Sequence, residues 1–399
     1  MQNFFFRAWL PTAMDREQLI ETYFSIGLNQ DEILECLAFN NGIIISRRHL
    51  QRILRNMNLY RRKNTSDVLE VALFIQEQLS ASGQMHGYRW LHLKCIQKGL
   101  VVTQQTVRIL LQILDPAGVE IRRRRRLRRR RYRNPGPNFT WHMDGYDKLS
   151  PYGICVSGCV DGYSRYVLWL EAYTTNSDPK VIAGYFINTV EKVHGCPRRI
   201  RADRGTENCL LKELQTFLRR NHEDSLADGK SFVYGKSTSN QRIEAWWAIL
   251  RKECVQFWMN VFGSIKDEGN FTSNFLDKSL IQFCFMRLVQ EDLDHVAFTW
   301  NCHRMQQYRN MIAPCGKPYL LYNTPELLGS RNHAVAVDRF DLQICRRECR
   351  FKSNAPCDKT VFELCCSLMA EHHLQAPTDA QEATVLYNFL RVCIHHELY

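Results

Sequence analysis

Three acidic residues stand where their carboxylates could share one site. Asp144 lies in the middle of an expected strand, 139–146, where an unpaired charge is disfavoured. Asp203 ends another expected strand, 198–203, and sites in open sheets assemble where strands end. Glu244 falls in the first turn of an expected helix. Three converging carboxylates could hold two Mg²⁺ ions about 3.5–4 Å apart, which suits the cleavage and joining of phosphodiester bonds.

Each acid also has a structural explanation. Aspartate before glycine is common in turns, and acidic residues are common near the start of helices. For one residue alone we prefer this explanation, but it accounts poorly for all three in the order strand, strand, helix. Asp161 competes with Asp144 as the strand carboxylate, although a hairpin turn at 161–163 explains Asp161 without chemistry.

The segments around the three acids predict one α/β domain with a mixed sheet, which we place at 138–262. Strand-like and helix-like patterns follow one another there in the order of that architecture. The expected elements are strands at 139–146, 153–160 and 164–173, a helix at 180–194, a strand at 198–203, a helix at 210–218, a strand at 231–234 and a helix at 240–257.

Three sequence blocks in this domain resemble a known family. They are Trp-His-Met-Asp-Gly-Tyr-Asp-Lys-Leu at 141–149, Ile-Arg-Ala-Asp-Arg-Gly-Thr-Glu-Asn at 200–208 and Ser-Asn-Gln-Arg-Ile-Glu-Ala-Trp-Trp at 239–247. They look like the signature blocks of the retroviral-type DDE integrase core, especially that of eukaryotic integrase-like DNA transposons or a host-adopted derivative. The resemblance implies an RNase H-like fold and DNA strand transfer by a homo-oligomer. It also implies that the acid of each block is catalytic and binds Mg²⁺ or Mn²⁺.

Two features depart from that family. The 40 residues between Asp203 and Glu244 make a longer gap than is usual in retroviral integrases, and 58 residues separate Asp144 from Asp203. Retroviral integrases also carry an N-terminal His-His-Cys-Cys zinc module, whose spacing does not occur before Asp144. The cysteines at 345, 349 and 357 lack the spacing of a zinc site, so we expect no structural zinc.

Residues near the acids are candidates for contacts with DNA. Asn240 lies one turn before Glu244, and Arg251 lies seven residues beyond it on the same helical face. Arg251 could touch a target phosphate, with Lys252 as a less well-aimed second choice. Asn208 could form a hydrogen bond near the metal site.

The segment 12–63 predicts short helices that end in a basic one. Asn29 is the expected cap of a second helix, and Ser46 that of a third, which begins at Arg47. A turn and a basic, capped helix suit a helix-turn-helix whose last helix enters the major groove. Its candidate DNA contacts are Arg47, Arg48, Gln51 and Arg52. The alternative is a three-helix cluster that does not bind DNA.

A second helical DNA-binding module is expected at 66–118. Helices follow Asp67, Gly87 and Thr103, and the pair Asp115-Pro116 is expected to stop the last of them. The region around 87–89 loosely resembles the N-terminal modules of bacterial insertion-sequence transposases.

An arginine-rich linker, 119–137, follows this module. Ten arginines lie between 122 and 133, and without them the formal net charge of +12 would be +2. A run of like charges indicates a polyanion partner, here double-stranded DNA, or a nuclear import signal, and it predicts a nuclear protein. The expected DNA contacts are Arg122, Arg123, Arg124, Arg125, Arg126, Arg128, Arg129, Arg130 and Arg131. The alternative is a solvated linker.

The rest of the composition excludes other classes of protein. The sequence contains no apolar run long enough to span a membrane and no pattern typical of a secretory signal. The 16 cysteines include no CxxC pair, so we expect reduced thiols inside a cell. The region 270–399 is expected to be mostly helical, with a helix at 276–305, a strand at 334–342 and an unassigned end.

The sequence therefore predicts a metal-dependent DNA integrase or transposase, a polynucleotidyl transferase that cleaves and joins DNA. One alternative is a host-adopted, non-catalytic DNA-binding protein that retains the core as a scaffold. Another is an RNase H-like nuclease, which would explain the carboxylates but not the helical modules.

Overall fold

The computed structural model of the chain describes residues 15–81, 83, 86–123, 134–235, 240–306 and 314–398. The side chains of residues 121–133 and 396–399 lie outside this description. The predicted DNA contacts at Arg122–Arg126 and Arg128–Arg131 therefore cannot be placed, although the backbone of Arg122 and Arg123 ends a helix.

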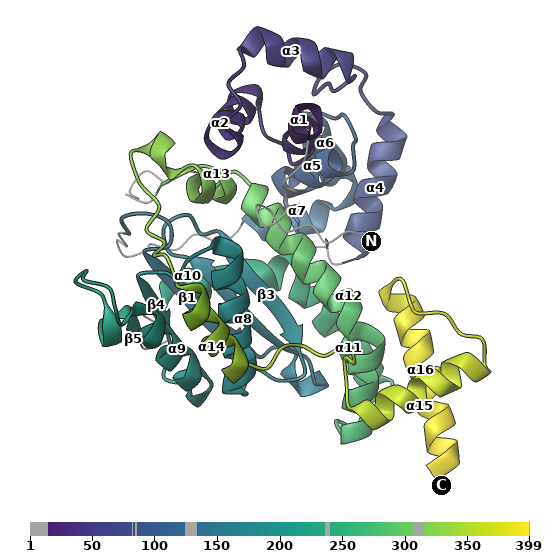
Figure 1. Cartoon of the computed structure of the whole chain (residues 1–399). Helices are drawn as coiled ribbons and strands as arrows, with labels where there is room; N and C mark the ends of the chain where they lie inside the picture. The colour runs from purple at the N-terminus through teal and green to yellow at the C-terminus, as the bar shows by residue number, and fades with distance from the viewer. Residues whose placement is uncertain are drawn as a thin grey trace.

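A five-stranded mixed sheet forms the centre of the molecule (Figure 1), as the sequence predicted. Its spatial order is β3-β2-β1-β4-β5, with β1 antiparallel to β2, β2 antiparallel to β3, and β4 and β5 parallel to the strands beside them. The strands are β1 (Thr140–Tyr146), β2 (Cys155–Asp161), β3 (Val167–Tyr173), β4 (Arg199–Ala202) and β5 (Phe232–Tyr234). This arrangement is an RNase H-like fold, which confirms the predicted fold class of the core.

Helices cover both faces of the sheet, because side chains along a strand alternate between its faces. One face packs against α8 (Pro179–Val193) and α9 (Cys209–Arg219) through a core that includes Trp141 and Met143 of β1. The other face packs against α10 (Gln241–Leu250), α11 (Gln256–Asp267) and α12 (Phe275–Cys302). The residues immediately before and after Met143 on β1 therefore point toward α10.

The helix expected at 240–257 is not continuous. A π-helical turn, Arg251–Val255, separates α10 from α11, and the helical segment continues to Asp267. In this turn Glu253 is buried, and its carbonyl oxygen lies 2.9 Å from Nε2 of the buried His86. The π-helical turn thus coincides with a contact from a segment distant in sequence. Local periodicity does not reveal such a contact, and so it did not predict the turn.

The long helix α12 covers the open edge of the sheet at β3. Gln290 accepts a hydrogen bond from the Ala172 amide (2.8 Å) and donates one to the Leu170 carbonyl (3.0 Å). Asn301 likewise accepts a hydrogen bond from the Val167 amide (2.8 Å) and donates one to the Val167 carbonyl (3.2 Å). Two side-chain amides therefore satisfy edge groups that would otherwise need water or another strand.

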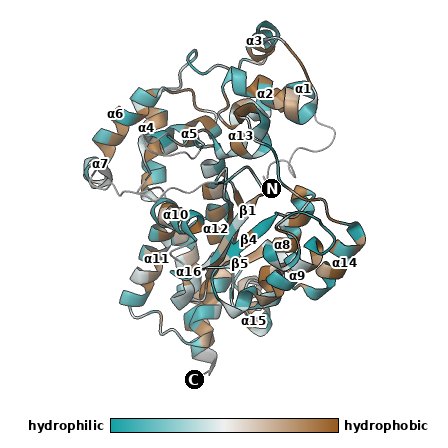
Figure 2. Ribbon diagram, turned by 90° about the vertical axis from the view of Figure 1, so that its left-hand side faces the viewer, coloured by the Kyte–Doolittle hydropathy of each residue, from teal (hydrophilic) through white to brown (hydrophobic). Residues whose placement is uncertain are grey.

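Seven α-helices precede the sheet in the described residues. Figure 2 shows that α2, α4 and α6 each carry both hydrophilic and hydrophobic residues. Asn29, Ser46 and Thr103 cap three of them through their side chains, as predicted, and Asp67 caps a fourth. The helices are α1 (Arg16–Ser25), α2 (Gln30–Asn41), α3 (Arg47–Asn56), α4 (Val68–Ser80), α5 (Tyr88–Gln97), α6 (Gln104–Leu114) and α7 (Pro116–Arg123). Helix α6 ends at Leu114 with Asp115 as its C-cap, as predicted, and Pro116 begins the next helix, α7, because proline suits the first position of a helix.

The N-terminal helices pack directly on the core domain. In α2 the buried Glu32 pairs with the buried Lys317 (2.7 Å), which comes just before α13 (Pro318–Asn323). In α5 the buried Trp90 belongs to the same hydrophobic core as α10 and α12. Breaking a buried pair such as Glu32–Lys317 leaves a charge without compensation, so this contact resists separation of α2 from the core.

Beyond residue 330, the described residues form three helices, α14 (Arg339–Glu348), α15 (Lys359–Glu371) and α16 (Ala380–Leu398). The strand expected at 334–342 is wrong: Val335 alone forms a bridge, to Cys196, and Asp338 then caps α14. Helix α14 lies against α8, whereas α15 and α16 pack on α12, which runs diagonally through Figure 1. No helix within the described residues has the length and apolar character needed to cross a membrane.

Candidate active site

Asp144 lies on β1, and Asp203 directly follows the end of β4, the strand parallel to β1. In the register of β1 and β4, Trp141 pairs with Ile200 and His142 with Arg201. Continued by two residues, this register brings Asp144 opposite Asp203, one residue beyond the end of β4. Adjacent strands are about 4.8 Å apart. Because Trp141 and Ile200 both face α8 and α9, alternation directs both aspartates to the opposite face, toward α10.

Asn240 fixes the start of α10 against β1. Its amide nitrogen donates to the Met143 carbonyl (2.9 Å), and its amide oxygen lies 2.7 Å from Nδ1 of His142. Burial lowers the pKa of His142 to about 3, so this ring stays neutral and its Nδ1–H can donate to Asn240. The backbone carbonyl of Asn240 accepts the first helical hydrogen bond, from Glu244 (3.2 Å). Glu244 is therefore held one turn from the strand that carries Asp144.

The three carboxylates interact electrostatically. Burial raises the pKa of Asp144, which is about 7, and the negative charges of Asp203 and Glu244 act in the same direction. Burial also raises the pKa of Glu244, and the charge of Asp203 adds to this effect. The negative charges of Asp203 and Glu244 therefore act on Asp144, and that of Asp203 also acts on Glu244.

Trp247 orients the carboxylate of Asp144. Its indole N–H donates to Oδ2 of Asp144 (3.0 Å), while the amide of Gly145 donates to Oδ1 (3.0 Å). The indole ring packs beside Tyr146, with ring centroids 5.0 Å apart. It lies over Gly158, the residue of β2 that pairs with Asp144. The missing side chain of Gly158 thus makes room for the residue that holds Asp144.

We expect Gly158→Ala to disturb this arrangement. A Cβ atom there would lie 2.6 Å from Cη2 of Trp247 and 3.2 Å from Cδ1 of Leu170, so the indole must shift away from Asp144. Overpacking of this kind costs about 1–3 kcal/mol of stability. Thermal unfolding should show the loss, and any metal-dependent activity should fall further than stability alone explains.

Gly263→Ala is the matched control for that variant. Gly263 lies in α11 with open space around its Cβ position, so alanine there should stabilise the helix by about 0.5–1 kcal/mol. If Gly158→Ala behaves like Gly263→Ala, the close packing of Trp247 has no influence on the site.

Sequence reasoning missed Trp247, Gly158 and His142 as parts of this site. The glycine inside a strand was a usable signal, because glycine there often marks the close approach of another group. The contact between His142 and Asn240 joins residues 98 positions apart, which no local pattern contains.

The other predicted neighbours lie in different settings. Asn208 is buried and donates to Oδ1 of Asp203 (3.2 Å), which places it beside the acids as expected. Asn240 is only 1% exposed and its amide is engaged by β1, so DNA could reach it only by displacing those bonds. Arg251 is exposed, and its charge acts on Tyr146. Lys252 is half-buried and pairs with Glu253 (2.6 Å).

Asp161 lies outside this group of acids. It is fully buried at the hairpin between β2 and β3. It accepts hydrogen bonds from the amides of Asn138, Tyr163 and Ser164 and from the Ser164 hydroxyl. The turn therefore accounts for this carboxylate without chemistry.

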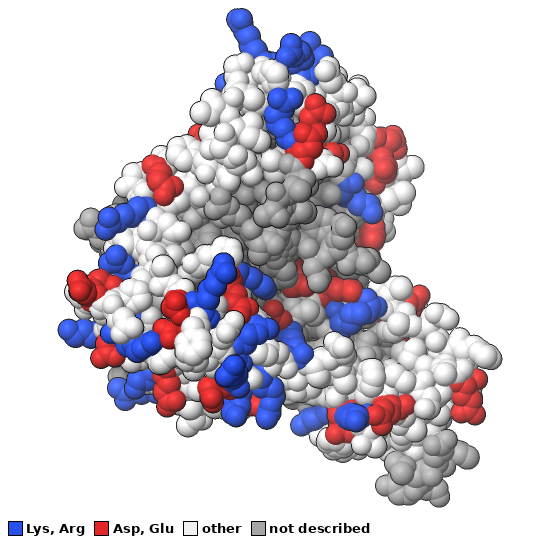
Figure 3. Space-filling view, viewed as in Figure 1, with Lys and Arg blue, Asp and Glu red and all other residues white. Residues whose placement is uncertain are grey.

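The four candidate DNA contacts on α3 are exposed. Arg47 pairs with Asp31 (3.2 Å), and Gln51 donates to Gln30 (2.9 Å). Arg52 lies 3.0 Å from Nδ1 of His49. The Arg48 side chain is exposed beside them and is free to meet a ligand from solvent. Figure 3 shows Lys and Arg side chains at the end of the molecule that α3 forms.

No group of three or more His, Cys, Asp or Glu side chains among the described residues has the spacing of a ready metal site. The donors at the three acids are nevertheless carboxylate oxygens, the type that Mg²⁺ prefers. Mg²⁺ keeps several waters and is held by few carboxylates together with substrate phosphate, so a complete cage of protein ligands is not needed.

The order and directions of the five strands are those of an RNase H-like domain. Residues 131–322 match the model of a family described as the integrase core domain. The chain thus carries a retroviral-type integrase core domain, of the kind found in DNA integrases and transposases. No curated protein matches the chain.

Proposed function

We propose that the protein cleaves DNA and transfers DNA strands in a metal-dependent reaction, with Asp144, Asp203 and Glu244 as the catalytic and metal-binding residues. The observation that supports this proposal is that Asp144 on β1, Asp203 directly after the parallel strand β4 and Glu244 on α10 are near enough for the charges of the other two to act on Asp144. This arrangement lies within the integrase core domain.

Mg²⁺ or Mn²⁺ would supply activation of the attacking water or 3′-hydroxyl and stabilisation of the leaving oxygen. The protein's own contribution is to hold the ligands. Trp247 and the Gly145 amide fix Asp144, and Asn208 fixes one oxygen of Asp203. Glu244 is exposed, so its carboxylate can reach a cation that DNA phosphate also binds.

Contacts with double-stranded DNA would come from several surfaces. Arg251, exposed beyond α10, is the candidate for a target phosphate near the acids. The exposed side of α3 would approach the major groove, and the arginine run at 122–133 would add contacts with the backbone. Acting on two DNA ends requires more than one copy of the site, so we propose a homo-oligomer, located in the nucleus.

A strand-transfer assay tests the proposal. Purified full-length protein is incubated with labelled duplex DNA that mimics an element end and with a plasmid target, in Mg²⁺, in Mn²⁺ or in EDTA. We expect cut ends and joined products with either metal and none in EDTA. Tight DNA binding without products in either metal would favour the alternative of a host-adopted DNA-binding protein.

A further inference from the structure

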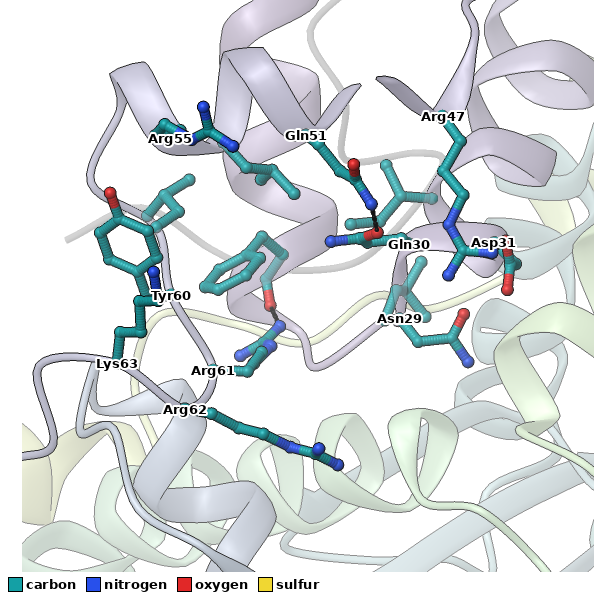
Figure 4. Close-up of a pocket in the computed structure, with 15 residues that line it drawn as sticks. Asn29, Gln30, Asp31, Arg47, Gln51, Arg55, Tyr60, Arg61, Arg62 and Lys63 are labelled. Atoms are coloured by element: carbon teal, nitrogen blue, oxygen red, sulfur yellow. Dashed lines mark hydrogen bonds and ion pairs between the residues drawn. The ribbon is translucent and has the colours of Figure 1, made fainter. Parts of the chain in front are cut away.

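A hollow of about 590 Å³ opens among the first three helices (Figure 4). One wall is the segment that follows α3, residues 59–63, together with Arg55 of α3 itself. The opposite wall is made by the start of α2 and the first turns of α3, and includes Asn29, Gln30, Asp31, Arg47 and Gln51. The floor is apolar and consists of Phe24, Leu28, Ile33 and Leu54.

The charges around this hollow are strongly one-sided. Its lining includes five cations and a single acid, Asp31, which pairs with Arg47 across the exposed rim (3.2 Å). Arg55, Arg62 and Lys63 are exposed and form no side-chain hydrogen bond or ion pair with any residue in the described ranges. Three unpaired cations around one concave surface favour a bound anion.

Arg61 holds the wall that carries two of these cations. Its guanidinium stacks on the ring of Phe24, 3.5 Å from the centroid, and donates to the Phe24 carbonyl near the end of α1. Burial lowers the pKa of Arg61 to about 10, which still leaves it charged at neutral pH. Because Arg61 is anchored, its neighbours Arg62 and Lys63 are held at the mouth of the hollow, and less entropy is lost when they bind an anion.

We propose that this hollow binds a backbone phosphate of double-stranded DNA, with Arg55, Arg62 and Lys63 as its ligands. The proposal rests on the proposed function, in which the protein acts on DNA. These three residues are distinct from the predicted DNA contacts on α3. Arg55 lies near the end of α3, beside the segment 59–63 (Figure 4). A phosphate held there would fix the position of α3 on the duplex, since phosphate contacts set register and base contacts set sequence preference.

The test compares two triple variants of the full-length chain. In the first, Arg55, Arg62 and Lys63 are each replaced with glutamine. In the control, Arg339, Arg347 and Lys359, exposed residues of α14 and α15, are replaced in the same way, which removes the same charge. Affinity for a fluorescein-labelled duplex of about 30 base pairs, long enough to cover the footprint of several modules, is measured by anisotropy over a series of salt concentrations.

The magnitude of the slope of log K against log salt should fall by about 0.9, the contribution of the one phosphate that the variant no longer neutralises. The control should leave the slope close to that of the wild type. Ethylation interference should further show a phosphate that matters to the wild type and not to Arg62→Gln. Melting curves establish that both triple variants are folded.

Equal slopes for the two triple variants would overturn the phosphate site while leaving the proposed function intact. If the hollow instead binds an acidic protein segment, replacing these three residues will leave the DNA affinity unchanged. That result would also overturn the phosphate site. If the wild-type protein itself shows no salt-dependent binding to duplex DNA, the proposed function and the phosphate site both fail.

Discussion

Replacing Glu244 with glutamine is expected to abolish DNA cleavage and joining. The amide keeps the shape of the side chain but removes the negative charge that binds a divalent cation. Losing a partner that only orients a metal ligand costs about 10–100-fold, so losing a ligand itself should reduce the rate by more than about 100-fold. Glu244 is exposed, and its removal also relieves repulsion with Asp203, so the fold should be unaffected.

The measurement is a single-turnover strand-transfer assay, accompanied by DNA affinity from anisotropy. Affinity should stay nearly the same, because a carboxylate is not itself a source of attraction for DNA. Glu70→Gln is the matched control, since Glu70 is also an exposed glutamate in the first turn of a helix, α4. Wild-type rates for Glu244→Gln would rule out the proposed set of three acids.

Replacing the ten arginines between Arg122 and Arg133 with glutamine should produce the largest change in DNA affinity. Each phosphate contact contributes about 0.9 to the magnitude of the slope of log K against log salt, so the slope should flatten by several units if most of the arginines touch phosphate. The same variant should lose nuclear localisation, because basic clusters act as import signals.

These two roles of the run can be measured separately. An unrelated nuclear import signal added to the glutamine variant should restore its location but not its salt-sensitive binding. An unchanged salt slope would mean that the run is a solvated linker, and that the main contacts with DNA lie on the helix that begins at Arg47.

Sequence predicted the sheet and its helices well, because each element of the core is encoded by local periodicity and by caps. Asp178, for example, is the N-cap of α8, and the hairpin at Asp161 joins β2 to β3. The helical caps at Asn29, Ser46 and Thr103 are equally local, because the side chain bonds a backbone group three residues away.

The features that sequence did not predict depend on contacts between distant segments. The π-helical turn accompanies the contact of Glu253 with His86, 167 residues away. Val335 pairs with Cys196 for a single bridge, so the alternating pattern at 334–337 resembled a strand without becoming one. The same limit applies to the site. The positions of Asp144 and Asp203 relative to each other depend on the pairing of β1 with β4, which neither segment specifies alone.

The amides of Gln290 and Asn301 on α12 have a consequence for how copies of this protein can assemble. A sheet with an open edge can recruit a strand from a second molecule, and such pairing can continue into aggregates. At β3 the positions that an incoming strand would need are already taken by these two side chains. The opposite edge, β5, is only three residues long. In the proposed homo-oligomer, we therefore expect the copies to contact one another through helices and loops and not through paired strands.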